Sequence, residues 1–450
     1  MSAGLLARHA PADAVAWDDR GEVTAGELRA DVGALASALA PGAGDAEVVV
    51  VCQDRYRFAV ALFAAWRRGL RVALTPSAEA EAIREVRQRP GVLTVLHDVD
   101  GTERGLDVRA ALAAGRGAAG PAPLVPPPGV AVTLFTSGST GAPAACPKTG
   151  DQLLGEAQLL VDHFGLARGG RVLPLVPPHH IYGLLFGVLR PLLAGAAFHR
   201  RTPLAPDRIA RAMGSAGGTE LTLVAVPVHL RALAGAPPEA FGAGVDRVFS
   251  SAAPLPPHVA SAVRERLGWT VTEVFGSTET GGIAWRDSGG RGPWRPLPGI
   301  AVRADEDGAL LLDSPFLPPE APRPYRSADR IQLGEGGTFV HLGRSDGVVK
   351  VGGFRVALAE VEERLGSVPG VEDVAALAVE VEGARGQEIW VVAVAPALRP
   401  ADLRASLKGV LPAVARPRRI RLVPALPRGP RGKARREDLM ALFQDRGAEG

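Results

Sequence analysis

The sequence predicts an α/β protein. Near the N-terminus, an almost continuous apolar run at residues 46–52 is typical of a strand covered on both faces. A helix over residues 57–68 and a strand at 70–74 complete a βαβ pattern. After residue 285 the pattern changes to short strands and turns, which indicates a β-rich subdomain. A helix at 359–365 then begins a small α/β unit.

The other elements follow from apolar runs and turn signals. Thr24 is a suitable N-cap for a helix over residues 28–39, and a second helix is expected at 151–164. The apolar runs predict further strands at residues 14–17, 132–135, 221–226, 245–250 and 271–275.

Composition limits the classes of function. A chain of 450 residues suggests about two or three domains, and a hydrophobic content of 46% is ample for a sizeable core. The net charge of +3 gives no sign of a nucleic-acid-binding protein. The 2 cysteines, Cys52 and Cys146, supply neither a disulfide framework nor a metal-ligand set, which favours a cytoplasmic location.

Targeting segments are not expected. Residues 1–12 carry Arg8 and His9 where a signal peptide needs an apolar core. The most apolar stretch, residues 172–198, contains prolines, histidines and Arg190, which argues against a membrane span.

A segment of hydroxyls and glycines, T-S-G-S-T-G at residues 136–141, follows the strand expected at 132–135. Glycines allow consecutive backbone N–H groups to point one way, and hydroxyls add donors, so such a segment can cradle phosphate oxygens. It is not the Walker loop, because G-x-x-x-x-G-K-[ST] is absent. A plain turn between a strand and a helix is the alternative.

The order T-S-G-S-T-G-x-P resembles the phosphate loop of the adenylate-forming enzymes, which include acyl-CoA synthetases, peptide-synthetase adenylation domains and luciferases. Nearly the whole chain shares this resemblance. It implies a large N-terminal domain of doubly wound α/β layers at 1–345, with a β-rich subdomain at about 286–343, and a small mobile α+β domain at 346–450. The resemblance assigns ATP binding to Thr136, Ser137, Gly138, Ser139, Thr140 and Gly141.

A second motif, F-G-S-T-E at residues 275–279, is similar to the family's Y-G-x-T-E. The resemblance places Phe275 against adenine, with Gly276 beside it, and Thr278 against the α-phosphate. Glu279 is expected to hold Mg²⁺, which binds carboxylate and phosphate oxygens together.

Further nucleotide contacts are implied downstream of the phosphate loop. The small-residue turn Ser251-Ala252-Ala253 resembles the one under the adenine ring, although a plain turn is the alternative. Asp329 matches the aspartate that binds the ribose hydroxyls, with Ser327 and Ala328 in place of Thr and Gly. Arg344 would add a ribose contact.

The C-terminal part resembles the family's mobile domain. The segment P-R-G-P-R-G-K-A-R-R places Lys433 at the catalytic lysine, with a basic solvated tail as the alternative. Asp346 falls at the interdomain hinge. The loop expected to face the thiol contains Lys350, Gly352, Gly353 and Phe354.

The acid-binding region carries fewer signals. His180 falls where the family has a histidine beside the reacting carboxylate, and the expected acyl pocket contains His229, Gly282 and Trp285. No Asp occurs between residues 180 and 190, which argues against an α-amino acid substrate. The stretch P-P-H-H-I-Y-G-L-L-F-G-V-L resembles ligases of aryl-polyene pigment clusters, which load aromatic acids onto a carrier protein.

One departure from the family concerns the phosphate loop. Ala144 stands where the family has a lysine, and Lys148 lies four residues further on. The loss should weaken ATP binding without abolishing the chemistry. Whether Lys148 takes over the role is open at this point.

These motifs predict an AMP-forming ligase. It would use ATP and Mg²⁺ to convert an aromatic or other acyl acid into an acyl-adenylate with release of pyrophosphate. The acyl group would then pass to the pantetheine thiol of an acyl carrier protein or CoA. The alternatives are a non-catalytic nucleotide- or acyl-binding homologue and a stand-alone amino-acid adenylation domain.

The sequence offers two acceptors, an acyl carrier protein and CoA. Arginines are concentrated in the C-terminal part of the sequence. They could form a docking face for an acidic carrier protein, and the alternative is a solvated basic surface. We favour the carrier protein from the sequence; the arginines are Arg416, Arg418, Arg419, Arg421, Arg428, Arg431, Arg435 and Arg436. The sequence leaves the acid and the oligomeric state open.

Overall fold

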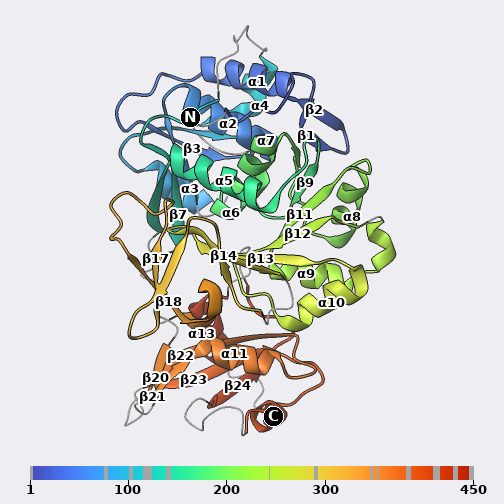
Figure 1. Ribbon diagram of the computed structural model, residues 1–450, viewed down its shortest axis with the longest axis vertical. Helices are drawn as coiled ribbons and strands as arrows, with labels where there is room; N and C mark the ends of the chain where they lie inside the picture. The colour runs from blue at the N-terminus through green and yellow to red at the C-terminus, as the bar shows by residue number, and fades with distance from the viewer. Residues whose placement is uncertain are drawn as a thin grey trace.

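The computed structural model describes residues 4–75, 80–100, 105–114, 124–137, 143–242, 244–287, 292–344, 348–351, 354–381, 387–408, 416–428 and 434–444. A large α/β part and a smaller C-terminal part follow one another along the long axis (Figure 1). The predicted α/β class, with a large N-terminal and a small C-terminal domain, is confirmed.

The largest sheet has nine strands in the order β15-β14-β13-β12-β11-β9-β10-β1-β2. Its central strands are parallel, whereas β2, β14 and β15 pair antiparallel at the edges. In open sheets of this kind, ligands bind at the carboxyl ends of the strands. The strands are β1 (Ala14–Asp18), β2 (Gly21–Thr24), β9 (Arg171–Pro174), β10 (Ala197–His199), β11 (Leu221–Ala225), β12 (Arg247–Ser250), β13 (Val271–Ser277), β14 (Gly281–Asp287) and β15 (Arg295–Pro296).

The second sheet has six strands in the order β6-β5-β3-β4-β7-β8. Strand β8 was not expected, because two prolines interrupt it. Its place at the sheet edge explains it, since edge strands tolerate residues that lack an N–H donor. The strands are β3 (Glu47–Val51), β4 (Arg71–Leu74), β5 (Val92–His97), β6 (Leu106–Asp107), β7 (Val130–Ser137) and β8 (Pro143–Thr149).

Helices cover both sheets (Figure 1). The predicted N-cap at Thr24 is confirmed, and its side chain forms a capping box with Glu27. The helices are α1 (Ala25–Ser37), α2 (Arg55–Arg67), α3 (Ala80–Arg87), α4 (Val108–Ala113), α5 (Gly150–Phe164), α6 (Ile181–Leu184), η1 (Leu185–Leu189), α7 (Arg190–Ala194), α8 (Pro206–Gly214), α9 (Pro227–Gly235), η2 (Pro238–Phe241) and α10 (Pro257–Leu267).

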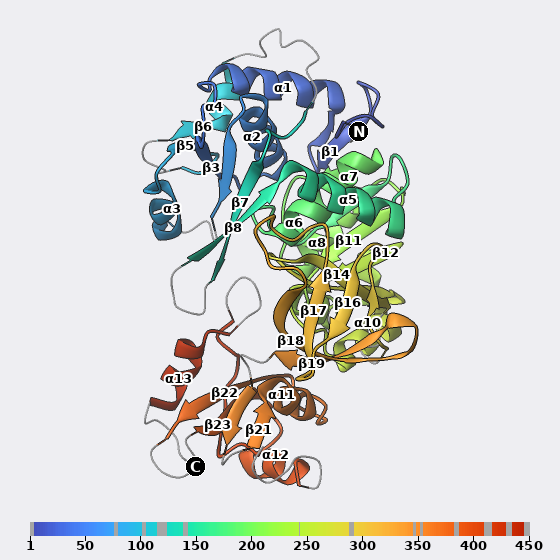
Figure 2. The same cartoon turned by 60° about the vertical axis from the view of Figure 1, so that its left-hand side comes forward.

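The expected β-rich region is a four-stranded antiparallel sheet in the order β16-β17-β18-β19. Its strands are β16 (Ala301–Ala304), β17 (Ala309–Asp313), β18 (Tyr325–Leu333) and β19 (Phe339–Arg344), with the short helix η3 (Glu335–Gly337) between the last two. Figure 2 shows that β18 and β19 lie between the α/β part and the C-terminal elements.

The C-terminal elements gather at the end of the molecule opposite α1 (Figure 2). They are β20 (Val348–Val351), β21 (Phe354–Ala357), α11 (Leu358–Gly366), β22 (Asp373–Glu380), β23 (Gln387–Val394), α12 (Pro400–Ser406), β24 (Arg419–Leu422) and α13 (Arg436–Gln444). The boundary at residue 345 stays a prediction, and the expected hinge residue Asp346 lies outside the described residues. None of the helices in the described stretches has the length and apolarity to cross a membrane.

Candidate active site

The F-G-S-T-E motif forms the β13–β14 hairpin near the middle of the molecule (Figure 1). Strand β13 runs two residues beyond the predicted end at Phe275, because Gly276 pairs with Gly282 across a bulge. A Cβ atom at Gly276 would collide with the carbonyl oxygen of Gly281, so only glycine fits there. Thr278 and Glu279 occupy the tip of the hairpin and are partly exposed.

Strand β8 and helix α5 hold this hairpin tip. The Lys148 ammonium group donates hydrogen bonds to the carbonyl oxygens of Glu279, at 2.9 Å, and Phe316, at 2.8 Å. The Glu156 carboxylate accepts a hydrogen bond from the Gly282 N–H at 2.6 Å. Burial lowers the pKa of Lys148 and raises the pKa of Glu156.

The position of Lys148 answers the question that the missing loop lysine raised. Lys148 is only 1% exposed, and its ammonium group donates hydrogen bonds to backbone carbonyl oxygens inside the protein. Lys148 therefore does not stand in for the lysine that Ala144 replaces.

The phosphate loop joins two antiparallel strands instead of a strand and a helix. Thr136 pairs with Ala144, and Ser137 pairs with Pro143, at the end of the β7–β8 hairpin where the loop connects the two strands. The residues expected to cradle phosphate, Gly138, Ser139, Thr140 and Gly141, lie outside the described residues. The roles of Thr136 and Ser137 stay predictions.

The expected ribose-binding carboxylate lies on the β18–β19 hairpin. Asp329 accepts hydrogen bonds from His341 Nε2 at 2.9 Å and Ser327 Oγ at 2.6 Å, and Arg344 Nη1 lies 3.5 Å from it. Burial by itself would raise the pKa of Asp329, but the hydrogen bonds and the Arg344 charge outweigh it, so the pKa is lowered. The carboxylate is thus held ionised, as an acceptor of hydroxyl protons must be.

Phe275 joins the same group of residues. Its ring centroid lies 5.0 Å from that of His341 and 5.4 Å from that of Trp294. We did not predict His341 and Trp294 as part of this site. A bulge between Arg330 and Ile331 sets the β18–β19 register that directs His341 toward Asp329.

The expected adenine turn follows β12. Ala252 adopts a left-handed conformation with φ of 70°, which is uncommon without glycine and occurs often at functional sites. The Ser251 hydroxyl donates to the carbonyl oxygen of Val274 at 2.7 Å, which ties the turn to β13. The buried Ser250 hydroxyl has no hydrogen-bond partner among the described residues.

The two histidines expected near the acid occupy helix N-termini. His180 is the N-cap residue of α6, and His229 lies in the first turn of α9. The Nδ1 atom of His229 accepts a hydrogen bond from the Val226 N–H at 3.4 Å. Burial lowers the pKa of His229 to about 4, so its imidazole is neutral at physiological pH.

The two other residues expected in the acyl pocket contact protein atoms. A Cβ atom at Gly282 would lie 3.0 Å from a Leu297 methyl group. The Trp285 ring packs edge-on against Phe164, at 5.8 Å between centroids, and against His163, at 5.2 Å. Their roles in substrate binding stay predictions.

Aromatic rings connect Trp285 to the helix that follows His180. The ring contacts run from Tyr182 to Phe186, from Phe186 to Phe249 and from Phe249 to Phe164, each at 5.0 Å between centroids. We call Tyr182, Phe186, Phe249, Phe164 and Trp285 the aromatic cluster. The sequence did not reveal it, because its members come from five separate elements, namely α6, η1, β12, α5 and β14.

Most of the predicted C-terminal site falls outside the described residues, namely Lys433, Gly352 and Gly353. The backbones of Lys350 and Phe354 belong to the β20–β21 hairpin. Among the C-terminal arginines, Arg428 forms a salt bridge with Asp373 at 2.7 Å, and Arg419 lies over the Trp390 ring.

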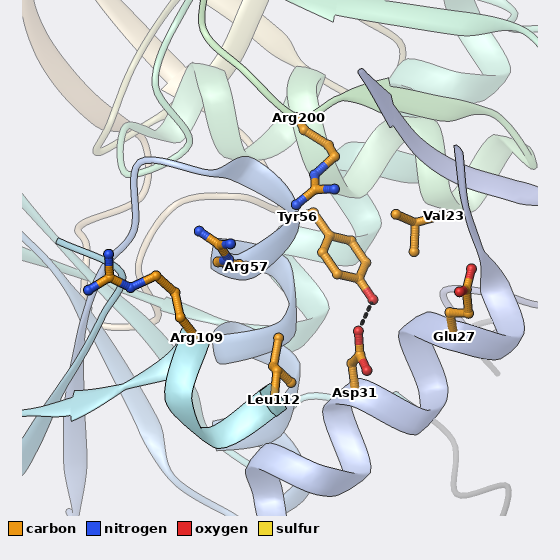
Figure 3. A pocket seen from close by; sticks show the side chains of 8 residues that line it. All are labelled: Val23, Glu27, Asp31, Tyr56, Arg57, Arg109, Leu112 and Arg200. Carbon is orange, nitrogen blue, oxygen red and sulfur yellow. Dashed lines mark hydrogen bonds between the residues drawn. The ribbon is translucent and has the colours of Figure 1, made fainter. Parts of the chain in front are cut away.

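A cavity of about 240 Å³ lies apart from these residues, among α1, α2 and α4 (Figure 3). Three arginines reach its wall, and each is paired with a carboxylate: Arg57 with Asp98, Arg109 with Asp107 and Arg200 with Asp54. The Tyr56 hydroxyl donates to Asp31 at 2.6 Å, as the dashed line shows. We interpret these charges as part of the scaffold.

Two family models match the chain. The model of the AMP-binding enzymes matches residues 6–315, and the model of the AMP-binding enzyme C-terminal domain matches residues 360–433. The first match alone covers more than half of the sequence.

Several named relatives are CoA ligases. A 4-coumarate–CoA ligase of Rhodobacter capsulatus is 40% identical over 303 residues, which cover 67% of this chain and 73% of the relative. A probable 2-succinylbenzoate–CoA ligase of Mycobacterium tuberculosis is 29% identical over 70% of this chain and 85% of its own length.

Solved structures share the fold. ATP-bound MatB from Rhodopseudomonas palustris has a TM-score of 0.81 at 22% identity, with 99% of both chains covered. The o-succinylbenzoate CoA synthetase from Bacillus subtilis has a TM-score of 0.82 at 19% identity, with 98% of both chains covered. The chain therefore belongs to the AMP-binding enzyme family and is an AMP-forming acid–thiol ligase.

Proposed function

We propose that this ligase activates an aromatic carboxylic acid with MgATP and transfers the aroyl or arylacryloyl group to CoA. The aromatic cluster is the observation that carries the proposal. Only 5% of the chain is aromatic, yet five rings gather where the segments around the expected carboxylate site meet. Two of these contacts are edge-on and two are tilted, and an environment of such rings favours a further aromatic ring over an alkyl chain.

The positions of the rings relative to the expected site support this choice. Tyr182 follows His180 by two residues, Phe249 precedes Ser251 by two, and Trp285 follows Gly282 by three. The relative with 40% identity is a 4-coumarate–CoA ligase, and its name specifies an aromatic acid.

In the first half-reaction, a carboxylate oxygen of the substrate attacks the α-phosphorus of ATP. The bond between the α-phosphorus and the bridging oxygen breaks, and pyrophosphate leaves with the electron pair. Thr278 would donate to the α-phosphate, while Asp329 would hold the ribose. Donors fixed in advance around the developing charge are usually the largest contribution to catalysis.

Magnesium fits the residues present. Glu279 offers one carboxylate at the hairpin tip, and Mg²⁺ is commonly bound through one or two carboxylates together with substrate phosphates. No group of three His, Cys, Asp or Glu side chains that could hold a metal occurs in the described part of the chain. Bound there, the ion would neutralise charge on the phosphates.

In the second half-reaction, a thiolate attacks the acyl carbon and AMP leaves. We propose CoA as the acceptor, because several named relatives, including the one with 40% identity, are CoA ligases. Transfer to a carrier protein stays a prediction. Arg428 and Arg419 are engaged within the protein, so Arg418, Arg435 and Arg436 are the exposed candidates for such a docking face.

The substrate class is tested with acid-dependent ATP–pyrophosphate exchange. The acids are 4-hydroxycinnamate, benzoate and octanoate at matched concentrations. We expect kcat/KM for an aromatic acid to exceed that for octanoate by about tenfold or more, a difference of about 1.4 kcal/mol. A preference for octanoate would contradict the proposal.

A pair of variants tests the role of the aromatic cluster. Phe186→Leu should lower the ratio of aromatic to alkyl activity, because it removes a ring from the cluster. Phe63→Leu is the matched control, since Phe63 is also buried but contacts Trp66 in another part of the core. If both variants leave the ratio unchanged, the cluster does not select the acid.

The acceptor is tested by comparing CoA with a holo-carrier protein at low and high salt. We expect efficient turnover with CoA at both salt concentrations. Turnover confined to the carrier protein, falling steeply with salt and lost in Arg418→Glu, would instead favour the docking face.

A further inference from the structure

Lys148 is an unusual residue for the middle of a hairpin strand. It lies opposite Val132 in the β7–β8 pair, and its residue is 1% exposed. Moving an ammonium group out of water costs several kcal/mol unless its hydrogen bonds are replaced. Here two carbonyl oxygens replace them, those of Glu279 and Phe316.

These two acceptors belong to segments far from Lys148 in the sequence. The Glu279 carbonyl lies at the tip of the β13–β14 hairpin, 131 residues from Lys148, and the Phe316 carbonyl follows β17 at a separation of 168 residues. One side chain thus fastens the phosphate-loop hairpin to the turn that carries Thr278 and Glu279.

Glu156 fixes the other end of the same turn. Its carboxylate binds the Gly282 N–H, and a Cβ atom at Gly281 would lie 2.6 Å from Glu156 Oε2. Gly281 also has a φ of +69°, a conformation that favours glycine. The backbone from Glu279 to Gly282 is therefore held at both ends by buried charged groups.

Cys146 adds a contact on the same strand as Lys148. Its thiol donates to the Thr278 carbonyl oxygen at 3.4 Å. Consequently the backbone carbonyls of Thr278 and Glu279 both face β8.

We propose that Lys148 and Glu156 are positioning residues that clamp the turn from Thr278 to Gly282, so that Thr278 and Glu279 are preset for MgATP. The inference rests on the proposed function of that turn. It assigns Lys148 a role in shaping the site, distinct from that of the lysine missing at Ala144. Removing the ammonium group would leave two buried carbonyls without a donor, and the turn would shift to satisfy them.

The decisive variant is Lys148→Met, which keeps the length of the side chain and removes its donors. In exchange assays, we expect the Mg²⁺ concentration for half-maximal rate to rise several-fold. We expect kcat to fall by about 10²-fold, the scale of a small misplacement of catalytic groups. Lys148→Gln keeps an N–H donor and should recover part of this loss.

A second readout does not depend on turnover. Hydrogen exchange of the protein without nucleotide or metal should show faster exchange of amides in residues 277–282 in Lys148→Met. Amides of β3 and β4, in the same sheet as β8 but distant from the turn, should keep their protection.

Gln152→Leu is the matched control. Gln152 is also buried, and its side-chain amide donates to the Leu317 carbonyl oxygen at 2.5 Å, next to Phe316. Its hydrogen bonds within the described part of the chain go to Thr149 and Leu317 and not to the turn, so its loss should lower the unfolding temperature while the Mg²⁺ requirement stays at the wild-type value.

Three results would overturn the inference. The first is a Mg²⁺ requirement in Lys148→Met equal to that of the wild type. The second is an equal change of the Mg²⁺ requirement in Lys148→Met and Gln152→Leu. The third is hydrogen exchange in Lys148→Met that becomes faster throughout the core instead of only in the turn. If Lys148→Met does not fold, the same measurements on Lys148→Gln decide. The panel of acids is measured first with the wild-type enzyme, and the best acid is then used for the variants. If the proposed substrate class is wrong, only the acid changes, and the comparison of Lys148→Met with Gln152→Leu can still be made.

Discussion

Two regions of the molecule bury charged groups in different ways. Beside the cavity of Figure 3, each buried charge has a side-chain partner: the Arg200 guanidinium lies 2.7 Å from the Asp54 carboxylate, which also caps α2, and Asp31 accepts a hydrogen bond from the Tyr56 hydroxyl. Beside the β13–β14 turn, the charged side chains of Lys148 and Glu156 bind backbone atoms.

The difference indicates what each region does. A pair of side chains that satisfy each other joins two elements and stabilises the scaffold. A buried charge that binds the backbone of a turn fixes the conformation of that turn. We therefore expect substitutions near the cavity to change stability, and substitutions around the turn to change catalysis.

Among substitutions expected to change catalysis, Lys433→Ala should have the largest effect. The resemblance gives Lys433 a role in adenylation alone, so the rate of that half-reaction should fall about 10²-fold or more. Thioester formation from supplied acyl-adenylate should continue. The check is to measure both half-reactions separately; an equal loss in both would contradict the two-state domain mechanism.

Glu279→Gln is expected to have the next largest effect. It removes the carboxylate at the hairpin tip, so the Mg²⁺ requirement should rise and adenylation should slow by about one to two orders of magnitude. The measurement is exchange activity as a function of Mg²⁺. An unchanged requirement would move the metal site elsewhere.

The lowered pKa of His229 predicts that the free energy of unfolding depends on pH. The folded protein keeps this imidazole neutral down to a pKa of about 4, whereas an exposed histidine protonates near 6.5. Between these values the unfolded chain binds more protons, so this contribution destabilises the protein progressively as the pH falls from 6.5 toward 4.

We expect this contribution to reach about 2 kcal/mol, discounted for the partial exposure of the residue. Urea unfolding at several pH values measures it, and His229→Gln should reduce the slope. A slope that the substitution does not change would assign the acid sensitivity to other groups.

The smallest effect is expected from Tyr56→Phe, at the scaffold side. The variant removes the hydrogen bond to Asp31 and should cost about 1 kcal/mol of unfolding free energy. Exchange activity of the folded variant should equal that of the wild type. A changed Mg²⁺ requirement would contradict the expectation that substitutions near the cavity affect stability and not catalysis.

Local patterns in the sequence predicted helices α1, α2 and α5 and several central strands, among them β3, β11 and β13. Thr24 with Glu27, and the apolar run of β3, contain their own signals, because capping and burial depend on nearby residues. Strand β8 could not be predicted in this way. Its prolines argue for a turn, and only its place at a sheet edge makes them acceptable.

In the candidate site too, residues in local motifs could be predicted, whereas residues placed by distant contacts could not. Motifs identified Phe275, Asp329 and Arg344, which the structure brings together with His341. The role of Lys148 could not be predicted, because a lysine in a polar-looking segment suggests an exposed side chain. Its burial depends on two carbonyls that only the folded chain brings near it.

The central claim is that the acid is activated as an acyl-adenylate, and oxygen labelling tests it most directly. The enzyme is supplied with ATP, CoA and 4-hydroxycinnamate that carries ¹⁸O in its carboxylate. Our account predicts one ¹⁸O atom in the phosphate of AMP and none in orthophosphate, because a carboxylate oxygen stays with AMP when the thiol attacks. Label in orthophosphate, together with formation of ADP, would contradict the account.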